Sequence, residues 1–216
     1  MNPGALGQSD PSVPVIIVSE VRDYVRINAE LVALLDSGHP RIRLEGAEGQ
    51  RLLASGLAGP WQATVEIQGR TGPELAANLE GPGLRIVARG NTQDGAGRAL
   101  RAGMILVVGD AGDGVGYAQS GGTLVVTRDV GHRAGLGQSG GTLAVLGSTG
   151  RLAGDRQSGG TFFLGRGEVG PYPGRGRRGG KRVGWLDPWD DQNRIAWNDV
   201  VEAVSPWVDP LILERR

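Results

Sequence analysis

The chain of 216 residues contains no cysteine, only two histidines and no long apolar run. The lack of cysteine excludes disulfides, zinc sites with cysteine ligands and cysteine-bound iron–sulfur clusters. Without a cysteine or histidine cluster, the sequence offers no convincing transition-metal site. No apolar stretch approaches the roughly 20 residues of a membrane-spanning helix, and no signal-peptide pattern is present. We therefore expect a soluble, cytoplasmic protein.

An excess of charge is also missing, since 23 Lys and Arg residues balance 23 Asp and Glu residues. A net charge of zero creates no overall field that would attract nucleic acid or an anionic membrane. Glycine, in contrast, is abundant, with 39 residues. Such an excess can indicate disorder or collagen, but there is no Gly-X-Y triplet pattern. The glycines are periodic and separated by aliphatic runs, which favours an ordered fold.

The glycines belong to a repeat with a period of 19 residues. The tetrapeptide Gln-Ser-Gly-Gly begins at Gln119, Gln138 and Gln157, and an apolar, β-prone run follows each copy. Further glycines keep the same step, in the rows Gly112, Gly131, Gly150 and Gly116, Gly135, Gly154. A fixed period with one strand in each unit is the signature of a solenoid, whose coils bury their apolar sides against one another.

This repeat predicts an all-β fold, a single right-handed parallel β-helix of about seven coils with short terminal helices. Strands are expected near residues 42–45, 64–68, 85–88, 104–108, 123–127, 142–146 and 161–164. Alternate strand residues should supply the core rows, with the inward phase open by one residue: Leu124, Val126, Leu143, Val145, Phe162 and Leu164. The predicted regions are an N-terminal lead-in with a capping helix (1–40), the β-helix (41–164) and a basic loop with a Trp-rich tail (165–216).

Short elements are expected on both sides of the β-helix. Residues 15–18 are typical of a strand. Residues 28–37 are typical of a helix with Asn28 as its N-cap and Gly38 as its stop, and this helix should cover the first coil. In the tail, residues 190–204 follow Pro188 and have the pattern of a short amphipathic helix.

Polar residues that recur with the repeat have a chemical and a structural interpretation. We expect the Gln row, and the Ser row beside it, to form ladders that satisfy polar groups between coils. Two acidic rows stop after two members each, Asp94 with Asp113 and Asp110 with Asp129. Calcium coordination would need a longer acidic row, so we favour the structural interpretation.

The remaining motifs also do not indicate a catalytic or ligand-binding site. Residues 112–116 resemble a phosphate-binding glycine loop, but another strand follows where a long helix would be required. His132 occupies a corner of the repeat and His39 a turn, and both are interpreted as surface residues. We therefore predict no catalytic, cofactor-binding or metal-binding residue.

The C-terminal region is the best candidate for contact with a partner. It holds a basic run and four of the five Trp residues, and Arg and Trp are enriched in binding hot spots. The predicted partner-binding residues are Arg175, Arg177, Arg178, Lys181, Arg182, Trp189, Trp197 and Trp207. Two other interpretations stay open, in which the basic run is a solvated loop and the tail caps the last coil.

The G-x-x-x-G-x-x-x-x-G-G spacing of Gly112, Gly116 and Gly121-Gly122, with an aliphatic strand after it, resembles the GXGXG right-handed β-helix family. That domain forms the C-terminal domain of the glutamate synthase large subunit and separate subunits of glutamate synthase-like amidotransferase systems. It also forms the β-helix subunit of formylmethanofuran dehydrogenase and of the related formyltransferase/hydrolase complex. The resemblance covers about residues 41–164. Residues 28–31, 48–50, 55–57 and 65–69 are similar to the entry of the glutamate synthase-like version.

The resemblance implies a structural element that spaces or organises catalytic partners. We therefore expect a non-catalytic scaffold subunit of a multi-subunit glutamate synthase-like amidotransferase/oxidoreductase complex, without a cofactor of its own. Its partners would be other subunits of the enzyme complex, and not nucleic acid or a membrane. Two alternatives stay open. One is the β-helix subunit of a formylmethanofuran dehydrogenase or formyltransferase/hydrolase complex. The other is a stand-alone β-helix enzyme acting on polysaccharide, for which the Asp rows are the only hint.

Overall fold

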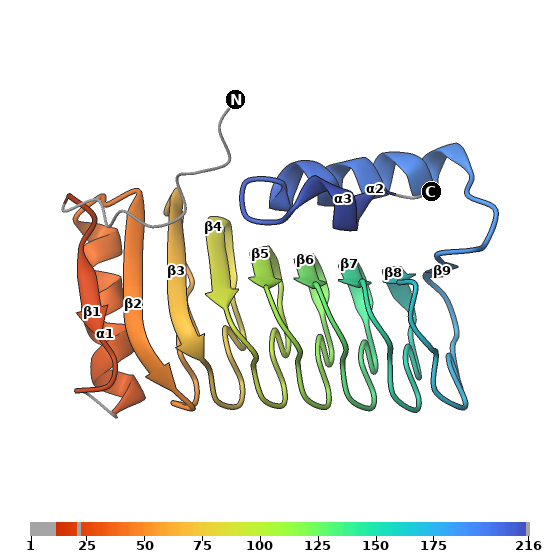
Figure 1. Cartoon of the computed structure of the whole chain (residues 1–216), viewed down its shortest axis with the longest axis horizontal. Helices are drawn as coiled ribbons and strands as arrows, with labels where there is room; N and C mark the ends of the chain where they lie inside the picture. Colours follow the sequence, from red (N-terminus) through yellow and green to blue (C-terminus); the bar gives the residue numbers. More distant parts are fainter. Residues whose placement is uncertain (1–11, 21–22, 215–216) are drawn as a thin grey trace.

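The computed structural model describes residues 12–20 and 23–214 of the chain. They form a rod built on one nine-stranded sheet in which each strand pairs in parallel with the next in sequence (Figure 1). The strands are β1 (Val15–Ile17), β2 (Arg41–Glu48), β3 (Ala63–Arg70), β4 (Glu80–Arg89), β5 (Ala102–Val107), β6 (Ser120–Val126), β7 (Ser139–Val145), β8 (Gly159–Leu164) and β9 (Lys181–Gly184). Seven consecutive turns connect β2 to β9, so the predicted parallel β-helix is confirmed.

The core follows from the alternation of side chains along each strand. The residues predicted to supply the core rows are all buried in one cluster along the axis of the rod, which fixes the inward phase that the repeat left open by one residue: Leu124, Val126, Leu143, Val145, Phe162 and Leu164. The residues between them point outward into a second apolar cluster, which includes Val125, Ala144 and Phe163. The sheet is therefore apolar on both faces, as strands buried on both sides require.

Two glycine rows close the corners of the coils for different reasons. Gly116 has a φ of +64°, a left-handed conformation that glycine adopts without steric cost. Gly112 lies in the other row, and a Cβ atom there would collide with the Asp94 side chain of the preceding coil. The segment 112–116 is therefore a corner of the solenoid, and a strand follows it.

Helix α1 (Tyr24–Asp36) covers the N-terminal end of the rod and buries Ile27, Leu31 and Leu35 against the core. The predicted cap was wrong, because Asp23 is the N-cap and Asn28 lies inside the helix. The Asn28 side chain instead reaches the first coil. Its Nδ2 donates to the Leu52 carbonyl (2.8 Å) and its Oδ1 accepts from the Ala54 N–H (2.9 Å).

The sheet continues one strand past the predicted end of the β-helix. Strand β9 pairs in parallel with β8 through Thr161–Lys181 to Leu164–Gly184. Residues 165–184 are therefore a further coil and not a loop. A step of 20 residues, seen in the pairing of Thr161 with Lys181, replaces the regular 19 at this coil.

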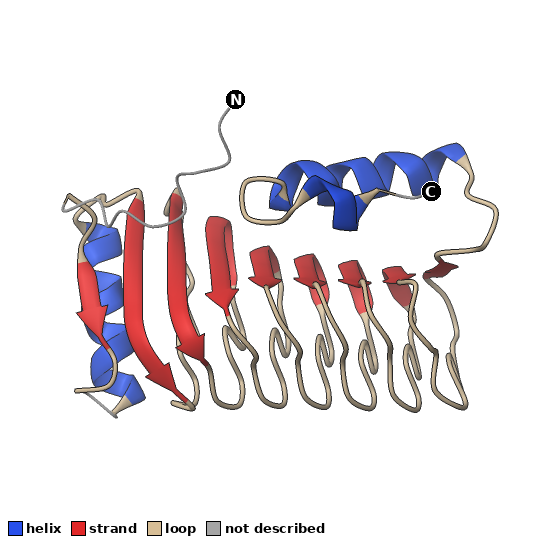
Figure 2. Ribbon diagram, viewed as in Figure 1, coloured by secondary structure: helices blue, strands red, loops and turns tan. Residues whose placement is uncertain are grey.

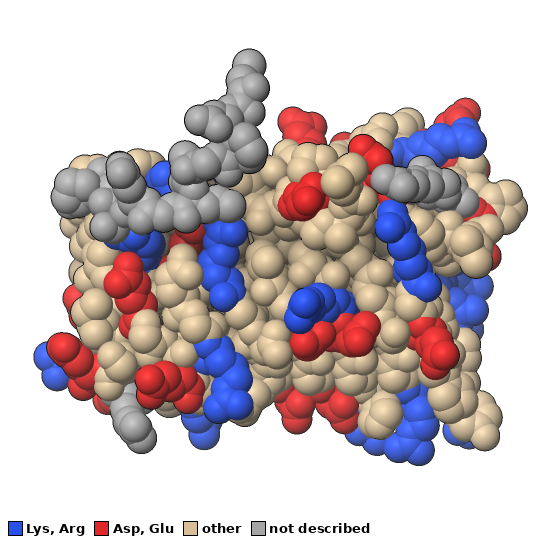
Figure 3. All heavy atoms as spheres, in the orientation of Figure 1, with Lys and Arg blue, Asp and Glu red and all other residues tan. Residues whose placement is uncertain are grey.

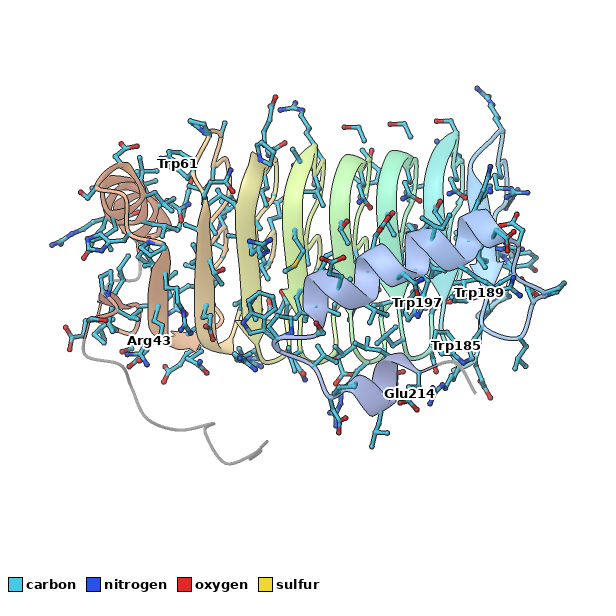
Figure 4. All side chains as sticks on the ribbon, turned by 90° about the horizontal axis from the view of Figure 1, so that it is seen from above. Arg43, Trp61, Trp185, Trp189, Trp197 and Glu214 are labelled. Atoms are coloured by element: carbon cyan, nitrogen blue, oxygen red, sulfur yellow. The ribbon has the colours of Figure 1, made fainter. Side chains whose placement is uncertain are left out.

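The tail folds back over the rod as helices α2 (Asp191–Val204) and α3 (Pro210–Leu213) (Figure 2). Asp190 caps α2 by accepting the Asn193 N–H at 2.7 Å, so the predicted helix is confirmed. Seen from above, α2 runs across the strands from the C-terminal coil towards the middle of the rod (Figure 4).

Candidate partner interface

The predicted basic residues lie together on the terminal coil at the C-terminal end of the rod. Arg175, Arg177, Arg178 and Lys181 are exposed, and Arg182 is half-buried. In Figure 3 several Lys and Arg side chains gather at this end, drawn on the right. The five basic residues belong to the same terminal coil, and we call this set the basic end (Arg175, Arg177, Arg178, Lys181 and Arg182).

The charges of the basic end are largely unpaired. Among the described residues, Lys181 alone of the five forms an ion pair, with Asp190 at 3.7 Å. Arg177 donates to the Gly180 carbonyl at 3.3 Å, which leaves its charge without a counterion. Two arginines of earlier coils are paired, Arg98 with Glu74 at 3.4 Å and Arg101 with Glu80 at 3.1 Å, whereas Arg128 and Arg133 form no ion pair with the described residues.

The predicted tryptophans are in a different environment. Trp189 and Trp197 are 6% and 5% exposed, and both rings contact Phe163, with centroids 5.4 and 5.3 Å away. Trp185 joins the same cluster, and the three Trp residues lie beside α2 at the C-terminal part of the rod (Figure 4). The indole of Trp197 donates to the Leu213 carbonyl at 3.3 Å and that of Trp189 to the Gly184 carbonyl at 3.0 Å.

The tail thus covers the outer face of the sheet and not the end of the last coil. Trp207 is partly buried beside this cluster, and its carbonyl accepts from Arg89 at 3.4 Å. Trp189 and Trp197 need no partner to bury them, because their own chain does so. Their contact with a partner stays a prediction, and the basic end is the exposed part of the predicted set.

The short Asp rows belong to ladders that connect the coils. The Oδ1 of Asp94 accepts from the Asp113 N–H at 2.8 Å, and that of Asp113 from the His132 N–H at 2.7 Å. His132 continues this ladder, since its Nδ1 accepts from the Arg151 N–H at 3.0 Å. These side chains each hold the backbone of the following coil, which is a structural role.

A second ladder runs parallel to the first. Asn91, Asp110 and Asp129 each accept the backbone N–H of the residue 19 positions on, at 3.0, 3.2 and 2.7 Å. Of the predicted Gln ladder one contact forms, between Gln157 Nε2 and Gln138 Oε1 at 3.1 Å in a fully buried setting, while Gln119 donates to the Thr142 carbonyl of the next coil at 3.1 Å. No group of three or more His, Cys, Asp or Glu residues in the described part of the chain is placed to hold a metal ion.

Backbone hydrogen bonds reveal a feature that sequence reasoning missed. Three N–H groups in each inner coil reach forward to carbonyls of the next coil. In the coil before the last these donors are Thr149, Leu152 and Arg156, at 2.8, 3.0 and 2.8 Å. Their counterparts in the terminal coil are Val169, Tyr172 and Gly176, whose N–H groups have no acceptor within the described residues. Only the 20-residue step, which places Gly179-Gly180 after Gly159-Gly160, signals this coil in the sequence.

None of the helices in the described ranges is long and apolar enough to cross a membrane. Comparisons with protein-family models and with curated proteins found no match for this chain.

Proposed function

We propose that this chain is a non-catalytic scaffold subunit of a multi-subunit enzyme complex of the glutamate synthase-like amidotransferase/oxidoreductase class. The chain would hold catalytic subunits at a fixed spacing, and glutamine hydrolysis and electron transfer would belong to those subunits. The proposal includes a cytoplasmic location. The choice of complex rests on the resemblance of the repeat, and the structural role rests on observations of the coils.

The observation that carries the structural role is the use of polar side chains at the corners of the coils. Asp94, Asp113 and His132 accept backbone N–H groups of the next coil. A carboxylate used in this way fixes the spacing of coils and is constrained in its reach towards a substrate. Regular coils joined by such ladders make a stiff rod, which suits a spacer between other proteins.

The same observation weighs against a stand-alone polysaccharide enzyme. Such an enzyme needs acidic side chains that converge on a bound sugar. The four row members Asp94, Asp113, Asp110 and Asp129 each accept a backbone N–H from the next coil. Activity of the isolated chain on uronic-acid polymers, lost in Asp113→Asn, would overturn the proposal in favour of that enzyme.

Co-purification from the native host tests which complex the chain joins. The full chain carries a tag at its N-terminus, and the proteins that elute with it at near-stoichiometric yield are identified by mass spectrometry. An amidotransferase or a flavin-binding synthase subunit supports the proposal. An amidohydrolase-like subunit with a formyltransferase subunit supports the formylmethanofuran alternative, and a chain that elutes alone contradicts both.

A further inference from the structure

The open end of the terminal coil offers a surface of defined chemistry. We propose that it binds an extended, acidic segment of a partner protein, which pairs with the unpaired backbone as a further coil would. This inference rests on the proposed function, because it names the surface by which the scaffold would hold a subunit. It concerns the basic end and the backbone of residues 169–177.

The backbone of the terminal coil presents both donors and acceptors to the open end. The unpaired N–H groups are those of Val169, Tyr172 and Gly176. The carbonyls of Pro173 and Arg177, each one residue after a donor, accept nothing within the described residues, whereas their counterparts Ala153 and Gln157 accept from Gly174 and Arg178. A polypeptide supplies carbonyls and N–H groups in alternation, so it matches this edge as a strand matches a sheet edge.

Apolar side chains at the same edge lack the cover that inner coils receive. Thr149 is 5% exposed, whereas Val169, the next member of its row, is 42% exposed. Tyr172 is 67% exposed. A segment laid along the edge would bury Val169, in the way that each inner coil buries the member of this row in the coil before it, and would contact Tyr172.

The positive charge of the basic end indicates that the bound segment is acidic. Arg175, Arg177, Arg178 and Arg182 surround the edge without a carboxylate partner in the described part of the chain, and arginine pairs with carboxylates in a bidentate geometry. Acidic side chains on the incoming segment would therefore be favoured at the positions that face these guanidinium groups. A nucleic acid would satisfy the arginines but would leave the carbonyls of Pro173 and Arg177 without N–H donors, and Tyr172 is the single aromatic ring at this edge.

A second copy of the chain does not fit the edge. Two basic ends brought together would place like charges in contact, which costs affinity. The opposite end of another copy is covered by α1, and Asn28 already takes the Ala54 N–H and the Leu52 carbonyl there. The occupant is therefore a segment of another protein.

The probe for this test is an eight-residue peptide that alternates Glu and Val, added to the full chain labelled for NMR. We expect chemical-shift changes at Val169, Tyr172 and Gly176, and slower hydrogen exchange of their amides in the bound state. Affinity should fall steeply as salt is raised. A matched peptide that alternates Lys and Val should not bind.

Two charge-reversed variants of equal net charge locate the surface. Arg175→Glu with Arg178→Glu should weaken binding of the Glu-Val peptide at least tenfold. Arg128→Glu with Arg133→Glu changes residues in the middle of the rod and should leave affinity within twofold. Equal loss in both variants, no binding at millimolar peptide, unchanged amide exchange, or tighter binding of an oligonucleotide than of the peptide would each overturn the proposal.

The same variants separate this inference from the proposed function. In co-purification from the native host, the basic-end variant should lose a subunit that the mid-rod variant retains. If both variants keep every subunit, the scaffold function stands and the basic end is not its contact. If the unmodified chain recovers no enzyme subunit, the proposed function fails, whatever the peptide does.

Discussion

The coil at each end of the rod has backbone groups with no neighbouring coil to bind, and the two ends differ in what is done with these groups. At the N-terminal end, helix α1 buries apolar residues against the first coil, and Asn28 accepts the Ala54 N–H that has no earlier coil to reach. The indole of Trp61 also donates a hydrogen bond of 2.9 Å to Asp36, at the end of the same helix. At the C-terminal end, the N–H groups of Tyr172 and Gly176 point past the last coil without acceptors in the described residues.

This difference indicates where a solenoid can gain a function. Every inner coil uses its backbone groups to bind its neighbours, so those groups are not free for other ligands. An end must be capped, charged or paired, because an open edge can bind the edge of another chain. Here the N-terminal end is capped and the C-terminal end is charged, which makes the second the place to expect a partner.

The contrast between the ends requires that the tail cover the side of the rod and leave the last coil open. Trp197→Ala removes the centre of the aromatic cluster that attaches α2, so we expect the free energy of unfolding to fall by about 3–5 kcal/mol. Urea denaturation followed by circular dichroism measures the change. Ile195→Ala, on the exposed side of the same helix, should change stability by less than about 0.5 kcal/mol. Similar losses in both variants would show that α2 does not attach through Trp197.

The capped end depends on one side chain for its backbone groups. Asn28→Ala leaves the Ala54 N–H and the Leu52 carbonyl without that partner, and we expect a loss of about 1–3 kcal/mol. Amide exchange of Ala54 should rise in the variant. Glu30→Ala, on the exposed part of α1, serves as the control and should leave both quantities unchanged. If the exchange rate of the Ala54 amide is unchanged in Asn28→Ala, Asn28 does not cap this end, and the contrast between a capped and an open end fails.

The stability of the inner coils should depend on the acceptor oxygen of each Asp in the ladder and not on the charge of the carboxylate. Asp113→Asn keeps an Oδ1 acceptor for the His132 N–H and should be close to neutral. Asp113→Ala removes the acceptor and should cost about 1 kcal/mol. Thermal unfolding of the two variants, side by side, checks this order, and equal destabilisation would point to a role for the charge.

The smallest effect is expected at the basic end. Arg175→Ala and Arg178→Ala remove exposed side chains without ion pairs in the described part of the chain, so each should change stability by less than about 0.5 kcal/mol. The same urea experiment measures them. A loss above about 1.5 kcal/mol in either variant would mean that these residues hold the terminal coil together and are not spare for a partner.

The sequence predicts the regular part of the rod well, because each 19-residue unit buries the same residue types in the same rows. Leu124, Leu143 and Phe162 could be placed in one row from that step alone, and the structure shows that this row faces the core. The terminal coil was missed since its step is 20 residues, and a loop rich in Gly and Arg has the same composition. The prediction of Asn28 as a cap was wrong because a helix N-terminus is a local pattern, whereas its actual partners, Leu52 and Ala54, are distant in sequence.

The side on which the tail packs could not be predicted either. Alternation along a strand shows that Val125, Ala144 and Phe163 face outward, but a two-sided apolar sheet does not specify what covers it. The tryptophans needed a buried environment, and both the outer face of the sheet and a partner could supply one. The packing of α2 therefore moves the candidate interface from the tryptophans to the basic end.

Hydrogen exchange of single backbone amides, measured by NMR on the free full-length chain, tests the open C-terminal end most directly. The amides of Tyr172 and Gly176 should exchange at least a hundredfold faster than those of Leu152 and Arg156, which occupy the same rows one coil earlier and have acceptors at 3.0 and 2.8 Å. Ala54, capped by Asn28, should be protected like the inner coils. Protection of Tyr172 and Gly176 equal to that of Leu152 and Arg156 would contradict an open end.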